Sequence, residues 1–189
     1  DVIAAARGLG LFTHLDGARL WNASIATGDS VRTLAAGFDT VSVCLSKGLG
    51  APVGSVVAST RETIVRAHRL RKMYGGGMRQ VGILAAAGLY ALAHHRERLA
   101  DDHANARMMA ERLHDVPGFT IDLAKVETNL VVIAVQPPLD AAALVAACAV
   151  EGVRISTIAP GRLRLVTHLD VDRAGCERAV AVLTAAAKR

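Results

Sequence analysis

Two charged residues stand where apolar segments of strand length end, in the first third of the chain. Asp16 follows the segment 9–15, and Lys47 follows the segment 40–46. In open α/β sheets, ligands bind beyond the carboxyl ends of strands, which is where both residues are expected. Pyridoxal phosphate uses such a pair, because a lysine binds it covalently and a carboxylate pairs with its pyridinium nitrogen. One helical crossover separates the two residues, which suits adjacent or nearly adjacent strands of one sheet.

These residue types alone leave other interpretations open. Desolvation at the end of an apolar strand favours the neutral, nucleophilic form of a lysine amine, but Lys47 also fits a surface loop. Asp16 also fits the N-cap of a helix that begins at Ala18. The loop 48–54 contains three glycines, which let backbone approach a ligand closely. It matches neither the P-loop nor the dinucleotide fingerprint, because its lysine precedes the glycines and its third glycine falls one residue late.

The sequence predicts a sheet that positions these residues. Apolar and β-branched runs predict strands at 9–15, 40–46 and 55–58. The second of these runs is apolar on both faces, as in a strand buried between helix layers. Helical patterns predict helices at 18–27, 30–37 and 60–73, and a long one over 80–113 with a break near His94 and His95. Asp29 or Ser30 is the expected N-cap of the helix at 30–37.

The pattern of predicted secondary structure changes after the turn at 116–118. Here the sequence predicts strands at 128–135, 152–156 and 163–166 and helices at 140–150 and 172–188. The expected fold class is α/β. A mostly parallel sheet with helices occupies residues 1–105, including the long connecting helix, and a small α+β domain occupies residues 106–189.

Composition excludes several classes of protein. The 189 residues are 52% apolar and 21% charged with a mean hydropathy of +0.33, which excludes a disordered chain. Only 3% are aromatic and the basic residues are scattered despite a net charge of +5, so a nucleic-acid partner is not expected. The basic helix at 61–72 is interpreted as a solvated or intersubunit face. Only four of the 22 basic residues are lysines, so Lys47 stands out.

Three widely spaced cysteines indicate no metal site and no disulfide framework, which suits the cytoplasm. No apolar run is long enough to span a membrane, and no signal peptide opens the chain. Because the chain begins with Asp1 rather than Met, it is expected to be a piece of a longer or processed product.

Four blocks of sequence resemble, in order, the low-specificity L-threonine aldolases, which are pyridoxal-phosphate enzymes of the aspartate-aminotransferase fold. The blocks are 14–23 (HLDGARLWNA), 44–55 (CLSKGLGAPVGS), 71–80 (RKMYGGGMRQ) and 164–171 (RLVTHLDV). The strand start Glu127-Thr-Asn129 also matches. The resemblance extends over nearly the whole chain but covers only about the carboxyl-terminal half of the family.

The resemblance implies a role for individual residues around the cofactor. Lys47 matches the lysine that carries pyridoxal phosphate, and Asp16 matches the partner of the pyridine nitrogen. Arg79 matches a residue that reaches the cofactor phosphate from a neighbouring subunit, and Ser46 is a further residue expected to face the phosphate. A solvated or paired surface arginine is the alternative for Arg79.

Two more arginines are implied in substrate binding. Arg19 matches an arginine near the cofactor ring oxygen and the substrate carboxylate, and Arg164 matches the one that binds the substrate α-carboxylate from the small domain. A guanidinium suits this task because it bonds both carboxylate oxygens. The alternatives are a surface arginine for Arg19 and an exposed strand arginine for Arg164. His14 and His168 receive no role, because the family's active-site histidines lie upstream of Asp16.

The implied reaction is retro-aldol cleavage of L-threonine or L-allo-threonine, a step of threonine catabolism and glycine biosynthesis that yields glycine and an aldehyde. The resemblance implies a homo-oligomer, a dimer or tetramer with shared active sites, and an amino-terminal half supplied by a second chain or by the intact gene product. Another pyridoxal-phosphate lyase or an aminotransferase of the same fold remains an alternative. So does an inactive fragment that only mediates subunit association.

Overall fold

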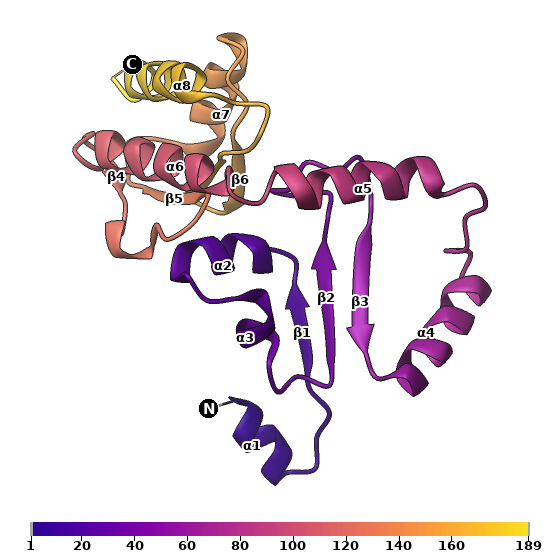
Figure 1. The fold of residues 1–189 in the computed structure, drawn as a ribbon. Coiled ribbons are helices and arrows are strands. Elements are labelled where there is room, and N and C mark those ends of the chain that lie inside the picture. The colour runs from indigo at the N-terminus through magenta and orange to yellow at the C-terminus, as the bar shows by residue number, and fades with distance from the viewer. Residues whose placement is uncertain (1, 189) are drawn as a thin grey trace. The chain divides into compact units, whose positions relative to one another are not determined.

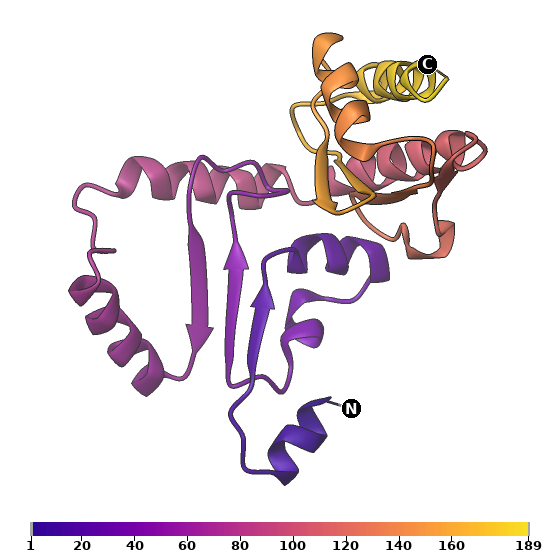
Figure 2. The ribbon, with the colours of Figure 1, turned by 180° about the vertical axis from the view of Figure 1, so that it is seen from behind.

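The computed structural model describes residues 2–188, which divide into two compact units between Glu97 and Arg98. Figures 1 and 2 show the elements of the first unit, which are α1 (Val2–Gly8), β1 (His14–Gly17), α2 (Leu20–Thr27), α3 (Val31–Ala35), β2 (Thr40–Cys44), β3 (Ser55–Ser59), α4 (Arg61–Met73) and α5 (Gly82–His94). The second unit comprises α6 (Leu99–His114), β4 (Phe119–Thr120), the 3-10 helix η1 (Leu123–Lys125), β5 (Leu130–Val135), α7 (Ala141–Val150), β6 (Ser156–Ala159), β7 (Arg162–Val166) and α8 (Arg173–Ala186). No helix within residues 2–188 is both long and apolar enough to cross a membrane.

The first sheet has the strand order β1-β2-β3 and is mixed rather than mostly parallel. β1 pairs with β2 in parallel, and β2 pairs with β3 in antiparallel fashion. Its two faces differ in polarity. One face carries Val41 and Val43 of β2, whereas the other carries Thr40, Ser42 and Cys44. The expectation that β2 is apolar on both faces is therefore wrong, because every second residue of the strand is polar or a thiol.

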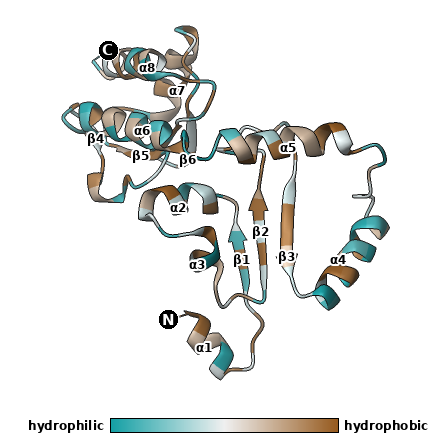
Figure 3. Cartoon of the chain, in the orientation of Figure 1, coloured by the Kyte–Doolittle hydropathy of each residue, from teal (hydrophilic) through white to brown (hydrophobic). Residues whose placement is uncertain are grey.

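Helix α5 crosses the end of the first sheet at which β2 finishes and β3 begins (Figures 1 and 2). The helix is apolar over most of its length (Figure 3), yet only Gly88 and Ala91 are buried. Ile83, Leu89 and Tyr90 are 83%, 69% and 59% exposed. A helix that is hydrophobic all round is normally buried, so α5 presents a surface suited to a protein partner.

The second unit is an antiparallel sheet with one buried and one exposed face. The strand order is β4-β5-β7-β6. Alternate residues of β5 and β7 are buried and join residues of α6, α7 and α8 in one apolar core, as seen for Val131, Ile133, Leu163 and Leu165. The neighbouring residues of the same strands point away from these helices. This is the small α+β architecture expected from the sequence.

The predicted helices correspond to α2–α8, but α1, η1 and β4 were not predicted, and two strands were misplaced. The expected break near His94 and His95 separates α5 from α6. Ser30 caps α3 by accepting a 3.0 Å hydrogen bond from the Thr33 amide. β1 covers 14–17 rather than 9–15, because the preceding apolar residues are exposed.

The second misplaced strand and the unit boundary have local causes. β6 covers 156–159 rather than 152–156, because Gly152 adopts a φ of 74° in the turn that closes α7. The division between the units falls ahead of the boundary expected at residue 105. Helix α6 packs along its whole length in the second unit, since both Leu99 and Leu113 are fully buried.

Candidate active site

Four of the predicted site residues lie at one edge of the first sheet. Asp16 is in β1, and Arg19 follows it in the turn that leads into α2. Ser46 and Lys47 follow β2, which is the parallel neighbour of β1. Since both strands of a parallel pair end at the same edge, the fold gathers a carboxylate, a guanidinium, a hydroxyl and an amine there.

Asp16 is held by local backbone contacts. Its Oδ1 accepts a 3.1 Å hydrogen bond from the Ala18 amide, and Arg19 rather than Asp16 occupies the N-cap of α2. A Cβ added to Gly17 would lie 2.7 Å from the Ser42 carbonyl oxygen, so β1 approaches β2 too closely for any other residue. Among the described residues, Oδ2 of Asp16 has no hydrogen-bond partner, which leaves one carboxylate oxygen for a ligand.

Lys47 occupies a closed loop between β2 and β3. The Leu45 amide donates to the Gly54 carbonyl, and the Ala51 amide donates to the Leu45 carbonyl, each at 3.0 Å. The Gly50 amide bonds the Lys47 carbonyl at 2.9 Å, and Gly50 adopts a φ of 68°. The Lys47 side chain is exposed, and its amine has no partner within residues 2–188.

Two aromatic side chains hold this loop, although the sequence interpretation assigned them no role. Trp21 Nε1 donates to the Cys44 carbonyl at 3.1 Å, and His95 Nδ1 bonds the Leu49 carbonyl at 2.7 Å. Trp21 belongs to a block that was singled out, and His95 marks a predicted helix break. Both residues are far from Lys47 in the sequence, and a single sequence does not show which distant residues come into contact.

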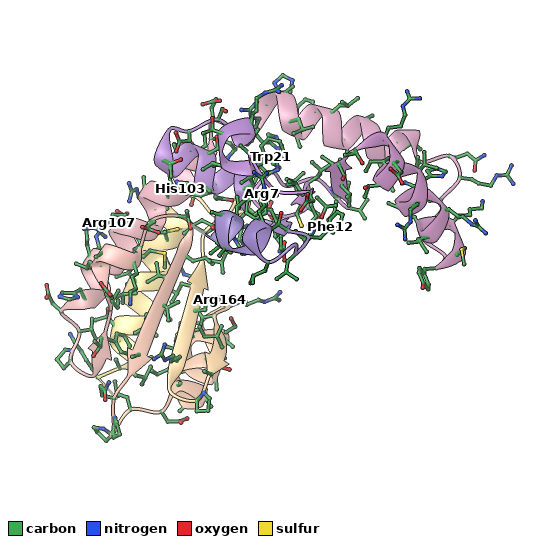
Figure 4. The ribbon with its side chains drawn as sticks, turned by 90° about the horizontal axis from the view of Figure 1, so that it is seen from below. Arg7, Phe12, Trp21, His103, Arg107 and Arg164 are labelled. Carbon is green, nitrogen blue, oxygen red and sulfur yellow. The ribbon has the colours of Figure 1, made fainter. Side chains whose placement is uncertain are left out.

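The other two predicted site residues belong to other segments of the chain. Arg79 is in the segment between α4 and α5, which lies beyond β3 on the side of the first sheet away from β1 (Figures 1 and 2). The chain itself therefore does not bring Arg79 to the edge that carries Lys47. Arg164 projects from the exposed face of β7 in the second unit (Figure 4), opposite Val132 of β5.

The carboxyl end of β7, which follows Arg164, is fixed by buried hydrogen bonds. Asn129 Nδ2 donates to the Thr167 carbonyl at 2.7 Å. The Thr167 hydroxyl donates to the Asp102 carbonyl at 2.6 Å, and the Asp102 carboxylate pairs with Arg98. These contacts tie β7, which presents Arg164, to β5 and α6.

The residues present fit pyridoxal phosphate. Within the described part of the chain, the charged groups of Lys47, Arg19, Arg79 and Arg164 have no hydrogen-bond or ion-pair partner. An unpaired amine and a carboxylate with a free oxygen, both at one edge of the sheet, match the covalent and ring-nitrogen partners that this cofactor needs. The unpaired guanidinium groups suit a phosphate or a carboxylate.

Other candidate reactive groups belong to the interior. Burial raises the pKa of the Cys148 and Cys176 thiols, so they are core residues rather than nucleophiles. Burial also lowers the pKa of His103, and Asp102 opposes this effect. Across residues 2–188, no group of three or more His, Cys, Asp or Glu side chains is arranged to hold a metal ion.

Comparisons with known proteins identify similar sequences and folds. The pattern of the beta-eliminating lyase family matches residues 1–136. The low specificity L-threonine aldolase of Escherichia coli O157:H7 is 47% identical over 163 residues, which cover 86% of this chain and 47% of that protein.

Two solved structures share the fold. A threonine aldolase of Leishmania major has a TM-score of 0.79 at 21% identity, covering 99% of this chain and 55% of that one. An α-aminoadipate aminotransferase of Thermus thermophilus has a TM-score of 0.73 at 18% identity, covering 99% and 52%. The chain thus spans about half the length of the curated relatives it matches.

Proposed function

Because the chain belongs to the beta-eliminating lyase family and is a homologue of the low-specificity L-threonine aldolases, we propose that it forms the lysine-bearing part of a pyridoxal-phosphate-dependent aldolase. The substrates would be β-hydroxy-α-amino acids such as L-threonine and L-allo-threonine, cleaved to glycine and an aldehyde. The observation that carries the proposal is the placement of Asp16 and Lys47 at one edge of the parallel pair β1–β2, each with a free polar group.

Residues of the first unit would bind and orient the cofactor. Lys47 would provide the amine that holds pyridoxal phosphate covalently, and Asp16 would accept a hydrogen bond from the protonated ring nitrogen. Ser46 would contribute to binding the phosphate, and Arg79 would bind the phosphate held by a neighbouring subunit. When bound, the cofactor supplies a ring that accepts the electrons released as the Cα–Cβ bond breaks. The carboxylate of Asp16 keeps the nitrogen proton in place, which sustains that electron demand.

Two arginines would bind the substrate carboxylate. Arg164 presents an unpaired guanidinium on a strand that hydrogen bonds tie to β5 and α6, and a guanidinium suits two parallel bonds to a carboxylate. Arg19, which is partly buried at the start of α2, would bind the ring oxygen and the same carboxylate. No residue of this chain is assigned as the base that takes the proton of the β-hydroxyl group.

A complete site would need further polypeptide. The curated relatives are about twice as long as the stretch that this chain matches. The exposed apolar surface of α5 and the unpaired outer edges of β1 and β3 in the first sheet suit additional protein. We therefore propose that the active form is a homo-oligomer with shared sites, which also contains the region that the relatives have and this chain lacks. A cytoplasmic location goes with this proposal.

A product assay tests the reaction. The chain would be incubated with pyridoxal phosphate and L-threonine or L-allo-threonine, with and without a polypeptide that comprises the unmatched region of the Escherichia coli relative. The proposal predicts glycine and acetaldehyde in equal amounts when both parts are present.

Each alternative has its own outcome in this assay. Formation of a 2-oxo acid in place of the aldehyde would indicate transamination or β-elimination on the same scaffold. A stable complex of both parts that contains the cofactor but forms no product would reject the proposed activity. A stable oligomer that takes up no cofactor would favour a role in subunit association alone.

A further inference from the structure

The loop that carries Lys47 is fixed at two carbonyl groups that lie on either side of the lysine. Cys44, the last residue of β2, precedes Lys47 by three positions, and Leu49 follows it by two. Each of these carbonyls accepts a hydrogen bond from an aromatic side chain that is remote in the sequence. The backbone of Lys47 is thus held from both directions.

The first of these donors is Trp21 of α2, which Figure 4 labels. Its indole Nε1 donates to the Cys44 carbonyl at 3.1 Å in a partly buried contact. The Arg96 guanidinium lies 5.6 Å from the Trp21 ring centroid, which is within the range of a cation–π interaction. Because α2 begins directly after Arg19 and four residues after Asp16, this bond links the segment that carries the carboxylate to the loop that carries the amine.

The second donor is His95, which directly follows α5. Its Nδ1 lies 2.7 Å from the Leu49 carbonyl oxygen. A carbonyl only accepts, so Nδ1 must carry the proton in this contact. The Tyr90 ring meets the His95 ring edge-on with centroids 5.5 Å apart. Leu49 is 1% exposed, so the loop is also anchored by burial of the residue whose carbonyl His95 holds.

Helix α5 adds a close contact at the start of the same loop. A Cβ added to Gly88 would lie 3.1 Å from Leu45 Cδ1, so the helix lies directly against the residue after β2. Helix α5 and the residue that follows it therefore contact the loop at two points, through Gly88 and His95. An unrestrained lysine loop would place the amine in many positions, and only some of them suit a bond to a cofactor held by Asp16.

We propose that Trp21 and His95 are positioning residues that fix the Lys47 loop so that the lysine amine is presented to the cofactor aldehyde. This proposal rests on the proposed function, because it assigns their effect to the role of Lys47. Neither side chain needs to touch the cofactor or the substrate. Their action is mediated by the carbonyls of Cys44 and Leu49.

The test compares the reactivity of the four lysines in the full 189-residue chain. The chain would be treated briefly with pyridoxal phosphate and then with borohydride, and the pyridoxyl group on each lysine would be quantified by mass spectrometry. Lys72, Lys125 and Lys188 serve as internal references. Trp21→Phe keeps an aromatic ring but removes the N–H donor, and His95→Ala removes the other donor.

Two matched variants separate positioning from a general structural effect. His95→Asn retains an N–H group where Nδ1 lies and should restore the bond to Leu49. His94→Ala removes the adjacent exposed histidine, which has no bond to the loop. Hydrogen exchange of the Leu45 and Ala51 amides, both bonded within the loop, would report its order in the same samples.

We expect Trp21→Phe and His95→Ala each to lower the share of label on Lys47 by about two- to tenfold, as follows from loss of one hydrogen bond. Exchange of the loop amides should accelerate in parallel, while His95→Asn and His94→Ala stay near the unmodified chain. If His95→Ala does not fold, judged by circular dichroism, Trp21→Phe and His95→Asn decide the question.

Two results would overturn the proposal and are distinguishable. If Lys47 is labelled in the unmodified chain and its share is unchanged in Trp21→Phe and His95→Ala, the positioning role is wrong and the role of Lys47 stands. If Lys47 of the unmodified chain is never labelled, also when the unmatched region of the Escherichia coli relative is supplied, the proposed function fails and this inference fails with it.

Discussion

Asp16 and Ser42 lie directly opposite each other in the parallel pair of β1 and β2, so their side chains leave the sheet on the same face. This face also carries His14, which bonds the Thr40 hydroxyl at 2.7 Å and approaches the Ser42 hydroxyl at 3.4 Å. Polar groups therefore line the strand pair up to the edge where Lys47 follows. The carboxylate proposed to hold the cofactor belongs to a polar face and not to an isolated surface position.

Replacing Asp16 separates its charge from its local structural role. In Asp16→Asn the amide oxygen still accepts the Ala18 hydrogen bond, but the negative charge is lost. Loss of a charge-assisted bond is worth about 1.5–3 kcal/mol, so we expect pyridoxal phosphate to bind about 10- to 150-fold more weakly. Cofactor titration by absorbance measures this change, and circular dichroism checks the fold. Unchanged affinity in Asp16→Asn would mean that the charge has no part in binding.

Replacing Arg164 should affect substrate binding more than turnover. We expect Arg164→Ala to raise KM for L-threonine by about 10- to 150-fold with a smaller effect on kcat, because a bidentate charge-assisted contact is lost. Arg164→Lys should retain only part of the substrate binding that Arg164→Ala loses. Arg162→Ala is a matched control, since Arg162 is exposed two residues earlier on the same strand. Steady-state kinetics would be measured on the chain combined with the unmatched region of the Escherichia coli relative. Equal increases in KM for Arg164→Ala and Arg162→Ala would argue against a specific role of Arg164.

The hydrogen bonds to Asp39 predict that the stability of the fold depends on pH. The Thr13 amide and hydroxyl donate to Asp39 Oδ2 at 2.7 and 2.9 Å and hold the pKa of this carboxyl below its ordinary value of 3.8. A carboxyl with a lowered folded-state pKa stabilises the fold above about pH 4, and this contribution is lost as the pH falls through the folded-state pKa. We expect Asp39→Asn to lower Tm at neutral pH, with the difference from the unmodified chain narrowing below about pH 4. Thermal scans in which this difference stayed constant down to pH 2 would contradict the linkage.

The exposed apolar surface of α5 predicts that copies of the chain associate with one another. We expect the isolated chain to form larger species as its concentration rises, because Ile83 and Leu89 are exposed on a helix without a polar face. Ile83→Asp and Leu89→Asp should shift sedimentation profiles towards the monomer. Val150→Asp is the control, since Val150 is 86% exposed at the end of α7 in the second unit. An equal shift for Val150→Asp would show that α5 is not the responsible surface.

Local signals predicted most of the helices correctly. Asp140 and Asp172 cap α7 and α8 by accepting hydrogen bonds from amides three residues later. Such caps involve residues close in the sequence, so sequence patterns can predict them. The break after α5 followed from the same kind of pattern. By contrast, the residues before β1 have strand-like composition but are exposed, because tertiary contacts decide which apolar runs enter a sheet.

The features of the candidate site also divide into those that local sequence predicts and those that depend on tertiary packing. Residue type and spacing, with the resemblance, made Asp16 and Lys47 candidates for the site and predicted correctly that the elements carrying them are neighbours. The bonds from Trp21 and His95 to the Lys47 loop depend on where α2 and α5 pack, which a single sequence does not report. The role of each of these residues stays a prediction until it is measured.

The most direct test of the proposed cofactor site is the position of covalent attachment when the chain is combined with the unmatched region of the Escherichia coli relative. Pyridoxal phosphate would be bound to saturation, the complex reduced with borohydride, and the modified peptide sequenced by mass spectrometry, with Lys47→Ala as the control. We expect one pyridoxyl group on Lys47 of this chain and none in Lys47→Ala. A saturated complex whose label lies on Lys72, Lys125 or Lys188, or on no lysine of this chain, would contradict it.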